Sequence, residues 1–256
     1  MRTLFILLLL LPVAGTFAQK NKKDDVSLYV FDENWKPCKI EQAKYLGCFR
    51  KLNDTAYQWK YYHFDGPLMA IETYKDKEGN IPHGKFVFFG ADGKVDSSGN
   101  TYDGKKNDWW YYMTDSSTLF RKEKYAQGKL LESMDTTAIR LEREEDKRKW
   151  DSRTVKDEVE ASFDGGDKAW AKFIQKNIEF PDRARNLKKE GTVVIQFIID
   201  KEGNVSDVEV VQSVEYSLDE EAIRLIQQAP KWNPAYMDGH NVKAYRKQPL
   251  TFQAPR

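Results

Sequence analysis

The stretch EGTVVIQFIIDKEGNV, residues 190–205, decides the fold of the second half of this chain. Residues 192–199 carry β-branched side chains on both faces, which is typical of a strand with little solvent contact. A glycine-containing loop at 200–204 follows, and the alternation at 205–214 predicts a returning strand. We therefore expect a hairpin whose first strand lies at the centre of a sheet.

Amphipathic helices are predicted on both sides of this hairpin. The first begins at Asp167, as its N-cap, and is ended by Pro181. The second begins at a capping box, residues 217–220, and is stopped by Pro230. Apolar residues on one face of each helix are expected to be buried: Trp170, Phe173, Ile174 and Ile178 in the first, and Leu218, Ala222, Ile223, Ile226 and Ala229 in the second.

A final strand is predicted at residues 242–252. Pro249 within it has no amide hydrogen, so the strand should lie at a sheet edge or contain a bulge. The order helix, strand, strand, helix, strand predicts that residues 161–256 form a two-layer α+β domain.

These residues resemble the C-terminal domain of the TonB family over about residues 161–252. Residues 180–185, FPDRAR, are similar to the aromatic-Pro-x-x-Ala-Arg motif of that family. EGTV at 190–193 is similar to the start of its first strand, and residues 200–205 are similar to its Asp-x-x-Gly-x-Val turn. Ser213, Leu218-Asp219, Ala222, Trp232 and Pro234 continue the pattern in order. The resemblance implies a non-enzymatic periplasmic protein that binds outer-membrane TonB-dependent transporters in energised transmembrane transport. Proton-driven motor proteins of the inner membrane are a further partner that it implies.

The final strand is the predicted partner-binding site. An open strand edge presents unpaired N–H and C=O groups, so a partner peptide can add to it as another strand. Arg185, Arg246 and Lys247 would orient an acidic partner segment, the alternative being ordinary solvated surface cations. The full set of predicted partner-binding residues is Ala244, Tyr245, Arg246, Lys247, Gln248, Leu250, Phe252 and Arg185.

The first half of the chain repeats weakly, with a period of 23 to 28 residues. The aromatic segments 59–62, 86–89 and 109–112 align, and turns follow them at Asp65-Gly66, Asp92-Gly93 and Asp115-Ser116. Each unit reads as a β-hairpin, so residues 19–131 predict an elongated antiparallel sheet. Gly84-Lys85-Phe86-Val87-Phe88-Phe89 resembles a degenerate MORN-type repeat. The aromatics are expected to pack as a core, the alternative being a platform for a ligand or glycan.

A charged segment joins the two halves. Residues 132–160 form a linker with many alternating acids and bases, including Glu144 with Arg148 and Glu145 with Lys149, each pair four residues apart. We expect a solvated helix over 139–160, about 30 Å long, which would hold the two domains apart.

Two features set this sequence apart from a TonB energy transducer. A transducer has a retained transmembrane helix and a proline-rich stretch, and neither is evident here. The alternative function is therefore an exported periplasmic scaffold or adaptor that is not coupled to the motor. Such a protein would bind another protein or an envelope glycan through the aromatic repeats.

The N-terminus predicts export. Arg2 precedes an apolar run, and Thr16-Phe17-Ala18 presents small residues at the cleavage positions of a signal peptide, residues 1–18. The run is shorter than the roughly 20 residues of a membrane-spanning helix. We expect a periplasmic protein, the alternative being an inner-membrane anchor facing the periplasm. Export also makes a disulfide between Cys38 and Cys48 plausible, against two free thiols.

Composition and motifs argue against several other functions. With 41 basic and 40 acidic residues, the formal charge of +1 lacks the excess that a nucleic-acid partner requires. His63, His83 and His240 belong to no recognisable catalytic or metal-binding pattern, and no cofactor fingerprint is present. We therefore expect no catalytic residues, no metal and no cofactor. A homodimer and a monomer both remain open.

Overall fold

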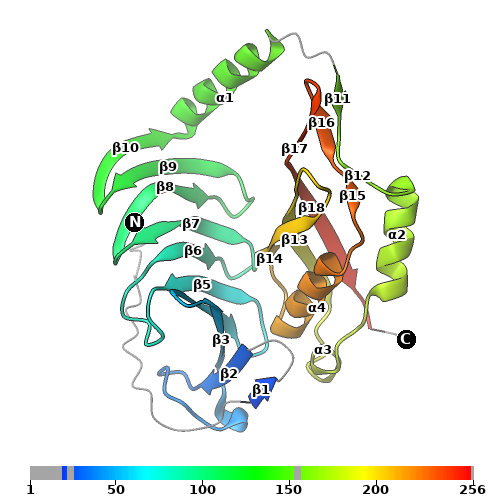
Figure 1. The fold of residues 1–256 in the computed structure, drawn as a ribbon. Coiled ribbons are helices and arrows are strands. Elements are labelled where there is room, and N and C mark those ends of the chain that lie inside the picture. The colour runs from blue at the N-terminus through cyan, green and yellow to red at the C-terminus, as the bar shows by residue number, and fades with distance from the viewer. Residues whose placement is uncertain (1–18, 22–25, 153–156, 255–256) are drawn as a thin grey trace.

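The computed structural model describes residues 19–21, 26–152 and 157–254. The predicted signal peptide, residues 1–18, lies outside the described residues. Within the described ranges, no helix is both long and apolar enough to cross a membrane. The molecule combines a large antiparallel sheet, called here the N-terminal sheet, with a mixed α+β part, residues 157–254, called the C-terminal domain (Figure 1).

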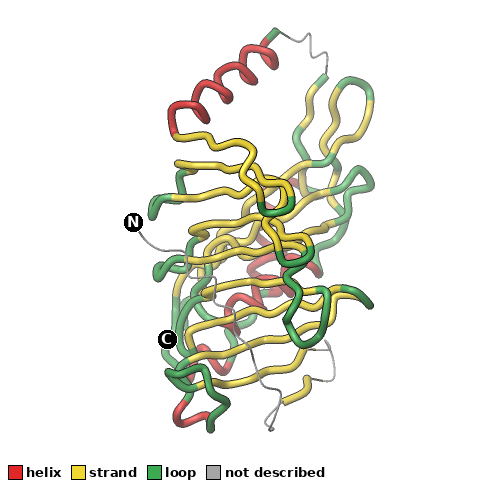
Figure 2. The backbone as a smooth tube through the Cα atoms, turned by 90° about the vertical axis from the view of Figure 1, so that its left-hand side faces the viewer, coloured by secondary structure: helices red, strands yellow, loops and turns green. Residues whose placement is uncertain are grey.

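The N-terminal sheet has ten strands, and each strand pairs antiparallel with its neighbour in the chain. Figure 2 shows these strands stacked one above another. The predicted turns at 65–66, 92–93 and 115–116 join β4 to β5, β6 to β7 and β8 to β9. The strands are β1 (Gln19–Asn21), β2 (Val26–Phe31), β3 (Tyr45–Asn53), β4 (Ala56–His63), β5 (Leu68–Tyr74), β6 (Gly84–Phe89), β7 (Val95–Tyr102), β8 (Lys105–Met113), β9 (Leu119–Ala126) and β10 (Lys129–Asp135), with a short 3-10 helix, η1 (Ile40–Gln42), after β2.

The two faces of the N-terminal sheet differ. On β4, Lys60 and Tyr62 face the C-terminal domain, and Trp59 and Tyr61 alternate to the opposite face. The aromatics on that opposite face pack on one another, and their buried members are Trp59, Tyr61, Tyr74, Phe86, Trp110 and Tyr112. Gly99 leaves room for this packing, because a Cβ at that position would lie 2.3 Å from the ring of Trp110.

The charged segment contains an exposed helix, as predicted, but the helix begins earlier and ends sooner than the expected range 139–160. β10 continues to Asp135, whose side chain caps α1 (Thr136–Asp151) by accepting a hydrogen bond from the backbone N–H of Ala138. Glu145 and Lys149 form the predicted ion pair at 2.8 Å, whereas Arg148 donates to the backbone carbonyl of Glu144. The helix does not reach residue 160, because the chain there pairs as strands with the C-terminal domain. These strands are β11 (Glu158–Val159) and β12 (Ser162–Phe163).

The C-terminal domain is built around the predicted hairpin. β13 (Gly191–Ile199) is the central strand of a sheet with the order β14-β13-β18, as the sequence predicted. α4 packs on β13 and β14 and buries most of the predicted apolar face of the second helix. The other elements are α2 (Gly166–Asn177), α3 (Asp182–Asn186), β14 (Val205–Gln212), α4 (Tyr216–Gln227), β15 (Trp232–Asn233), β16 (Ala235–Met237), β17 (His240–Val242) and β18 (Ala244–Phe252).

Both predicted helix caps were wrong. Gly165, in the left-handed conformation, precedes α2, so Asp167 lies in the first turn. Glu215 caps α4 and accepts hydrogen bonds from the backbone N–H and the hydroxyl of Ser217 at 2.9 and 2.6 Å. Glu220, expected to complete a capping box, instead pairs with Lys60 of the N-terminal sheet at 2.7 Å. Pro181 does not end α2, which stops at Asn177, but precedes α3.

The two parts of the molecule share one hydrophobic core. Tyr62 and Leu68 of the N-terminal sheet are fully buried in the same cluster as Leu218 and Ile226 of α4. The ring of Tyr62 meets that of Tyr216 edge to face, with 5.5 Å between the ring centroids. The expectation that a spacer holds two domains apart is therefore incorrect, because continuous apolar packing joins them.

Candidate functional site

The strand that was predicted to bind a partner, β18, lies at the edge of its sheet. β18 pairs with β13 over nine consecutive positions, from Gly191 opposite Phe252 to Ile199 opposite Ala244, with no register shift. Among the described residues no strand pairs with its other side. Pro249 sits within this regular ladder, so of the two predicted explanations, edge or bulge, the edge is correct.

The side chains of β18 divide between its two faces. Tyr245 and Lys247 are exposed, and Tyr245 retains 73% of its surface. Leu250 and Phe252 are buried in the core, so only their main-chain groups could meet a partner. Gln248 accepts a hydrogen bond from the indole N–H of Trp170 at 2.7 Å, which ties the strand to α2.

The three predicted cations do not gather at one place. Arg185 pairs with Asp182 and donates to the carbonyl of Phe180, so it braces its own turn. Arg246 donates to the carbonyl of Ala161 at 2.8 Å and covers the ring of Trp232. The described structure gives no ion pair for Lys247, the third cation. Neighbours within the domain therefore hold both arginines, whereas Lys247 borders a cleft.

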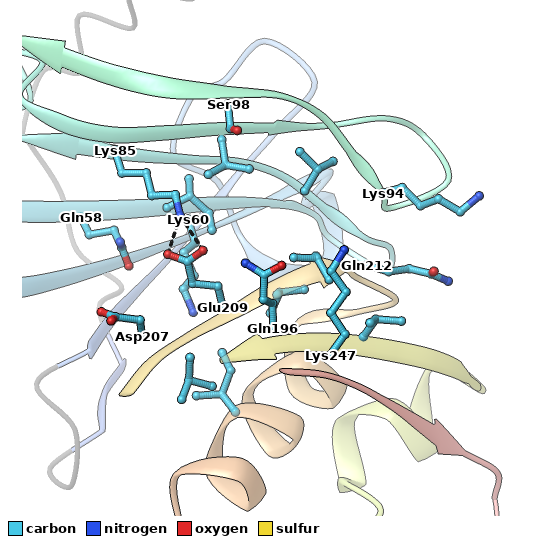
Figure 3. Close-up of a pocket in the computed structure, with 18 of the residues that line it drawn as sticks. Gln58, Lys60, Lys85, Lys94, Ser98, Gln196, Asp207, Glu209, Gln212 and Lys247 are labelled. Atoms are coloured by element: carbon cyan, nitrogen blue, oxygen red, sulfur yellow. Dashed lines mark hydrogen bonds and ion pairs between the residues drawn. The ribbon is translucent and has the colours of Figure 1, made fainter. Parts of the chain in front are cut away.

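Sequence reasoning missed that cleft. It has a volume of about 520 Å³ and lies between the N-terminal sheet and the C-terminal domain. Figure 3 shows Lys85 of β6 reaching across it to Glu209 of β14. Its basic residues are Arg50, Lys60, Lys85, Lys94 and Lys247, and its acidic residues are Asp207 and Glu209. No local sequence signal could have identified it, since its two walls come from residues 50–117 and 194–247, which are distant in the sequence.

A buried polar cluster lies where the two parts meet. The hydroxyl of Ser213 donates to Asp219 at 2.5 Å and accepts from the backbone N–H of Leu68 at 2.8 Å. Asp219 also accepts from the backbone N–H of Val214. Burial raises the pKa of the Asp219 carboxyl to about 7, although these hydrogen bonds act in the opposite direction.

Ion pairs flank this cluster on both sides. Burial opposes the charge of Glu220, but Lys60 and Arg50 outweigh it and lower the pKa of this carboxyl. On the other side, Arg183 binds the buried carboxylate of Glu215 and the carbonyl of Phe64. The N-terminal sheet is thus attached to the C-terminal domain by charged hydrogen bonds as well as by apolar packing.

The structure gives the state of the two cysteines and the grouping of side chains that could bind a metal. Cys38 and Cys48 are free thiols, so the predicted disulfide is not formed in this structure. Cys48 belongs to the core shared with the C-terminal domain, and burial raises the pKa of its thiol. In the part of the chain that the structure describes, no three His, Cys, Asp or Glu side chains are grouped so that they could hold a metal ion.

Comparison with known proteins identifies the C-terminal part. Residues 176–254 match the family model described as Gram-negative bacterial TonB protein C-terminal. The solution structure of the Helicobacter pylori TonB C-terminal domain is similar, with 23% sequence identity over 34% of this chain and 78% of that chain, and a TM-score of 0.28. No curated protein matches the chain. None of these findings bears on the MORN-type resemblance of the first half. The family match shows that the C-terminal part is a TonB-like domain.

Proposed function

We propose that this protein binds outer-membrane TonB-dependent transporters by strand addition to β18, as a non-enzymatic periplasmic component of energised transmembrane transport. One observation carries the proposal: a TonB-like domain offers an unbroken nine-residue strand at the open edge of its sheet. Main-chain hydrogen bonds spread over several residues would give the affinity, and the alternating side chains would give the selectivity.

The order of exposure along β18 supports a main-chain mode of binding. Tyr245 and Lys247 lie on one exposed face, whereas Leu250 and Phe252 anchor the strand in the core. Such a strand is held firmly from behind while its outer N–H and C=O groups stay available. Lys247 is the one predicted cation left to attract an acidic side chain of a partner segment, since both arginines serve internal contacts.

Site-directed cross-linking tests the proposal. The variant Tyr245→Cys, in a Cys38→Ser background, would carry a photoactivatable cross-linker in cells, and mass spectrometry would identify the trapped peptide. We expect the N-terminal plug segment of a TonB-dependent transporter. The matched control is Leu131→Cys, which is similarly exposed on β10, the open edge of the other sheet. Equal capture of transporter from both positions, or none from Tyr245→Cys, would contradict the proposal.

The second candidate function is an adaptor that never engages the inner-membrane motor. It is favoured by the shared core, because a chain packed against the TonB-like domain from β2 to β5 is not an extended tether across the periplasm. Its binding surface would be the aromatic face of the N-terminal sheet. Fractionation separates the two: a soluble periplasmic chain beginning at Gln19 indicates the adaptor, and a chain retained in the inner membrane indicates the transducer.

A further inference from the structure

The sheet of the TonB-like domain has two edges, and they differ in regularity. β18 pairs with β13 without interruption. β14, at the other edge, shows register shifts at two places, and Asp207 within it has a φ of 48°. Bulges interrupt the hydrogen-bond ladder and twist a strand away from a flat edge, which is a common protection against edge pairing. The edge of β14 is therefore a less regular template than that of β18, but its outward main-chain groups still offer pairing sites unless something covers them.

The N-terminal sheet covers the end of this irregular edge. The turn between β6 and β7 seats on the C-terminal end of β14, where Gly93 accepts a hydrogen bond from the backbone N–H of Ser213 at 2.8 Å. Next to it, Lys94 and Gln212 form an antiparallel bridge. Main-chain groups that a partner strand would need at this end are already paired within the chain.

The contact at Gly93 tolerates no side chain. Gly93 has a φ of 75°, and a Cβ there would lie 2.1 Å from the carbonyl oxygen of Ser213 and 3.0 Å from Pro67. The backbones of two distant segments can approach this closely only because one of them carries glycine. Glycine at position 93 therefore serves the contact with the residue after β14 as well as the turn itself.

An ion pair fastens the remainder of the edge. Lys85 of β6 crosses the cleft to Glu209 in the middle of β14 (Figure 3). The cleft is lined by the continuous run 207–212 of β14. A strand approaching this edge would have to enter the cleft and separate Lys85 from Glu209.

From these contacts we infer that the N-terminal sheet is an intramolecular edge cap that makes the TonB-like domain one-sided. It closes β14 against strand addition, by a partner or by a second copy of the chain, and leaves β18 as the edge that can be extended. The inference rests on the proposed function only for the identity of the β18 partner, because the closure of β14 involves no other molecule.

The full-length chain carrying Gly93→Val tests the cap. The matched control is Gly104→Val, which places the same side chain at a φ of 79° in the turn after β7, where a Cβ would meet only Pro82 at 4.0 Å. We expect amide hydrogen exchange at residues 208–213 to accelerate about tenfold or more in Gly93→Val relative to the control. We also expect sedimentation to show association through β14 that wild type and control lack.

A second, milder variant tests the cap independently, in case Gly93→Val does not fold. Lys85→Glu places a carboxylate opposite Glu209, and Lys77→Glu makes the same charge change at an exposed position away from the cleft. Faster exchange at 207–211 in Lys85→Glu alone, at an unchanged melting temperature, supports the cap. Identical exchange and sedimentation in each variant and its control would overturn it. Because no transporter is present, these outcomes are independent of the cross-linking result.

Discussion

Ser213 donates its hydroxyl proton to Asp219 at 2.5 Å in the buried polar cluster where the N-terminal sheet meets the TonB-like domain. The same hydroxyl accepts from the backbone N–H of Leu68, 145 positions earlier in the chain. This one side chain therefore links the start of α4, the end of β14 and the start of β5. The contact explains why the two halves of the chain cannot be treated as independent domains.

The stability of the protein should fall as the pH rises from about 4 to about 7, through Asp219. The pKa of this carboxyl is about 7 in the folded chain and roughly 3.9 when unfolded, so the folded state binds more protons in that interval. The loss should reach at most about 4 kcal/mol in the free energy of unfolding. Urea denaturation at several pH values measures it. Asp219→Asn should lack this component, and equal pH profiles for both proteins would contradict it.

Removal of the Ser213 hydroxyl should destabilise the whole molecule. Ser213→Ala leaves the buried N–H of Leu68 without its acceptor, which costs about 1–3 kcal/mol. Because the core is shared, calorimetry should show one unfolding transition at a lower temperature. Ser206→Ala, on β14 and away from the contact between the two parts of the molecule, should change the unfolding free energy by less than about 0.5 kcal/mol. Separate transitions for the two halves would refute the shared core.

Tyr62→Phe should leave stability unchanged or raise it by up to about 1 kcal/mol. The hydroxyl of Tyr62 is buried and has no hydrogen-bond partner among the described residues, so its desolvation is uncompensated. Tyr62→Ala should instead cost about 3–5 kcal/mol, since it removes a ring at the centre of the shared core. Denaturant titration of both variants separates the two effects, and a destabilised Tyr62→Phe would reveal a partner for the hydroxyl.

Arg246 and Lys247, adjacent on β18, should behave in opposite ways. Arg246→Ala loses a hydrogen bond to Ala161 and the contact with Trp232, so it should cost about 1–2 kcal/mol of stability. Lys247→Ala should leave stability within about 0.5 kcal/mol of wild type. If Lys247 attracts an acidic partner segment, this variant should still lower the cross-linking yield at Tyr245→Cys. A stability loss at Lys247 equal to that at Arg246 would contradict the assignment.

Much of the secondary structure could be predicted, because it depends on neighbours in the sequence. The β-branched run at 192–199 identified the central strand, and Pro249 indicated a strand at a sheet edge or with a bulge, of which the structure has the edge. The Asp-Gly turns placed several hairpins of the N-terminal sheet. The helix caps failed for a physical reason: Glu220 matches the local pattern for a capping box, but Lys60 offers its carboxylate a stronger, charged partner from 160 residues away.

The sequence by itself determined most of the elements and the TonB-like character of the C-terminal domain, and it limited β18 to a sheet edge or a bulge, since periodicity and turn chemistry act over a few residues. Only the tertiary structure decided that Arg246 is an internal brace, that Asp219 is buried, and that the turn at Gly93 covers β14. Those outcomes depend on which distant surfaces meet. Where these surfaces meet, the surroundings are buried and of low polarity, which strengthens the hydrogen bonds and ion pairs there. A pattern of neighbouring residues in the sequence does not reveal that burial.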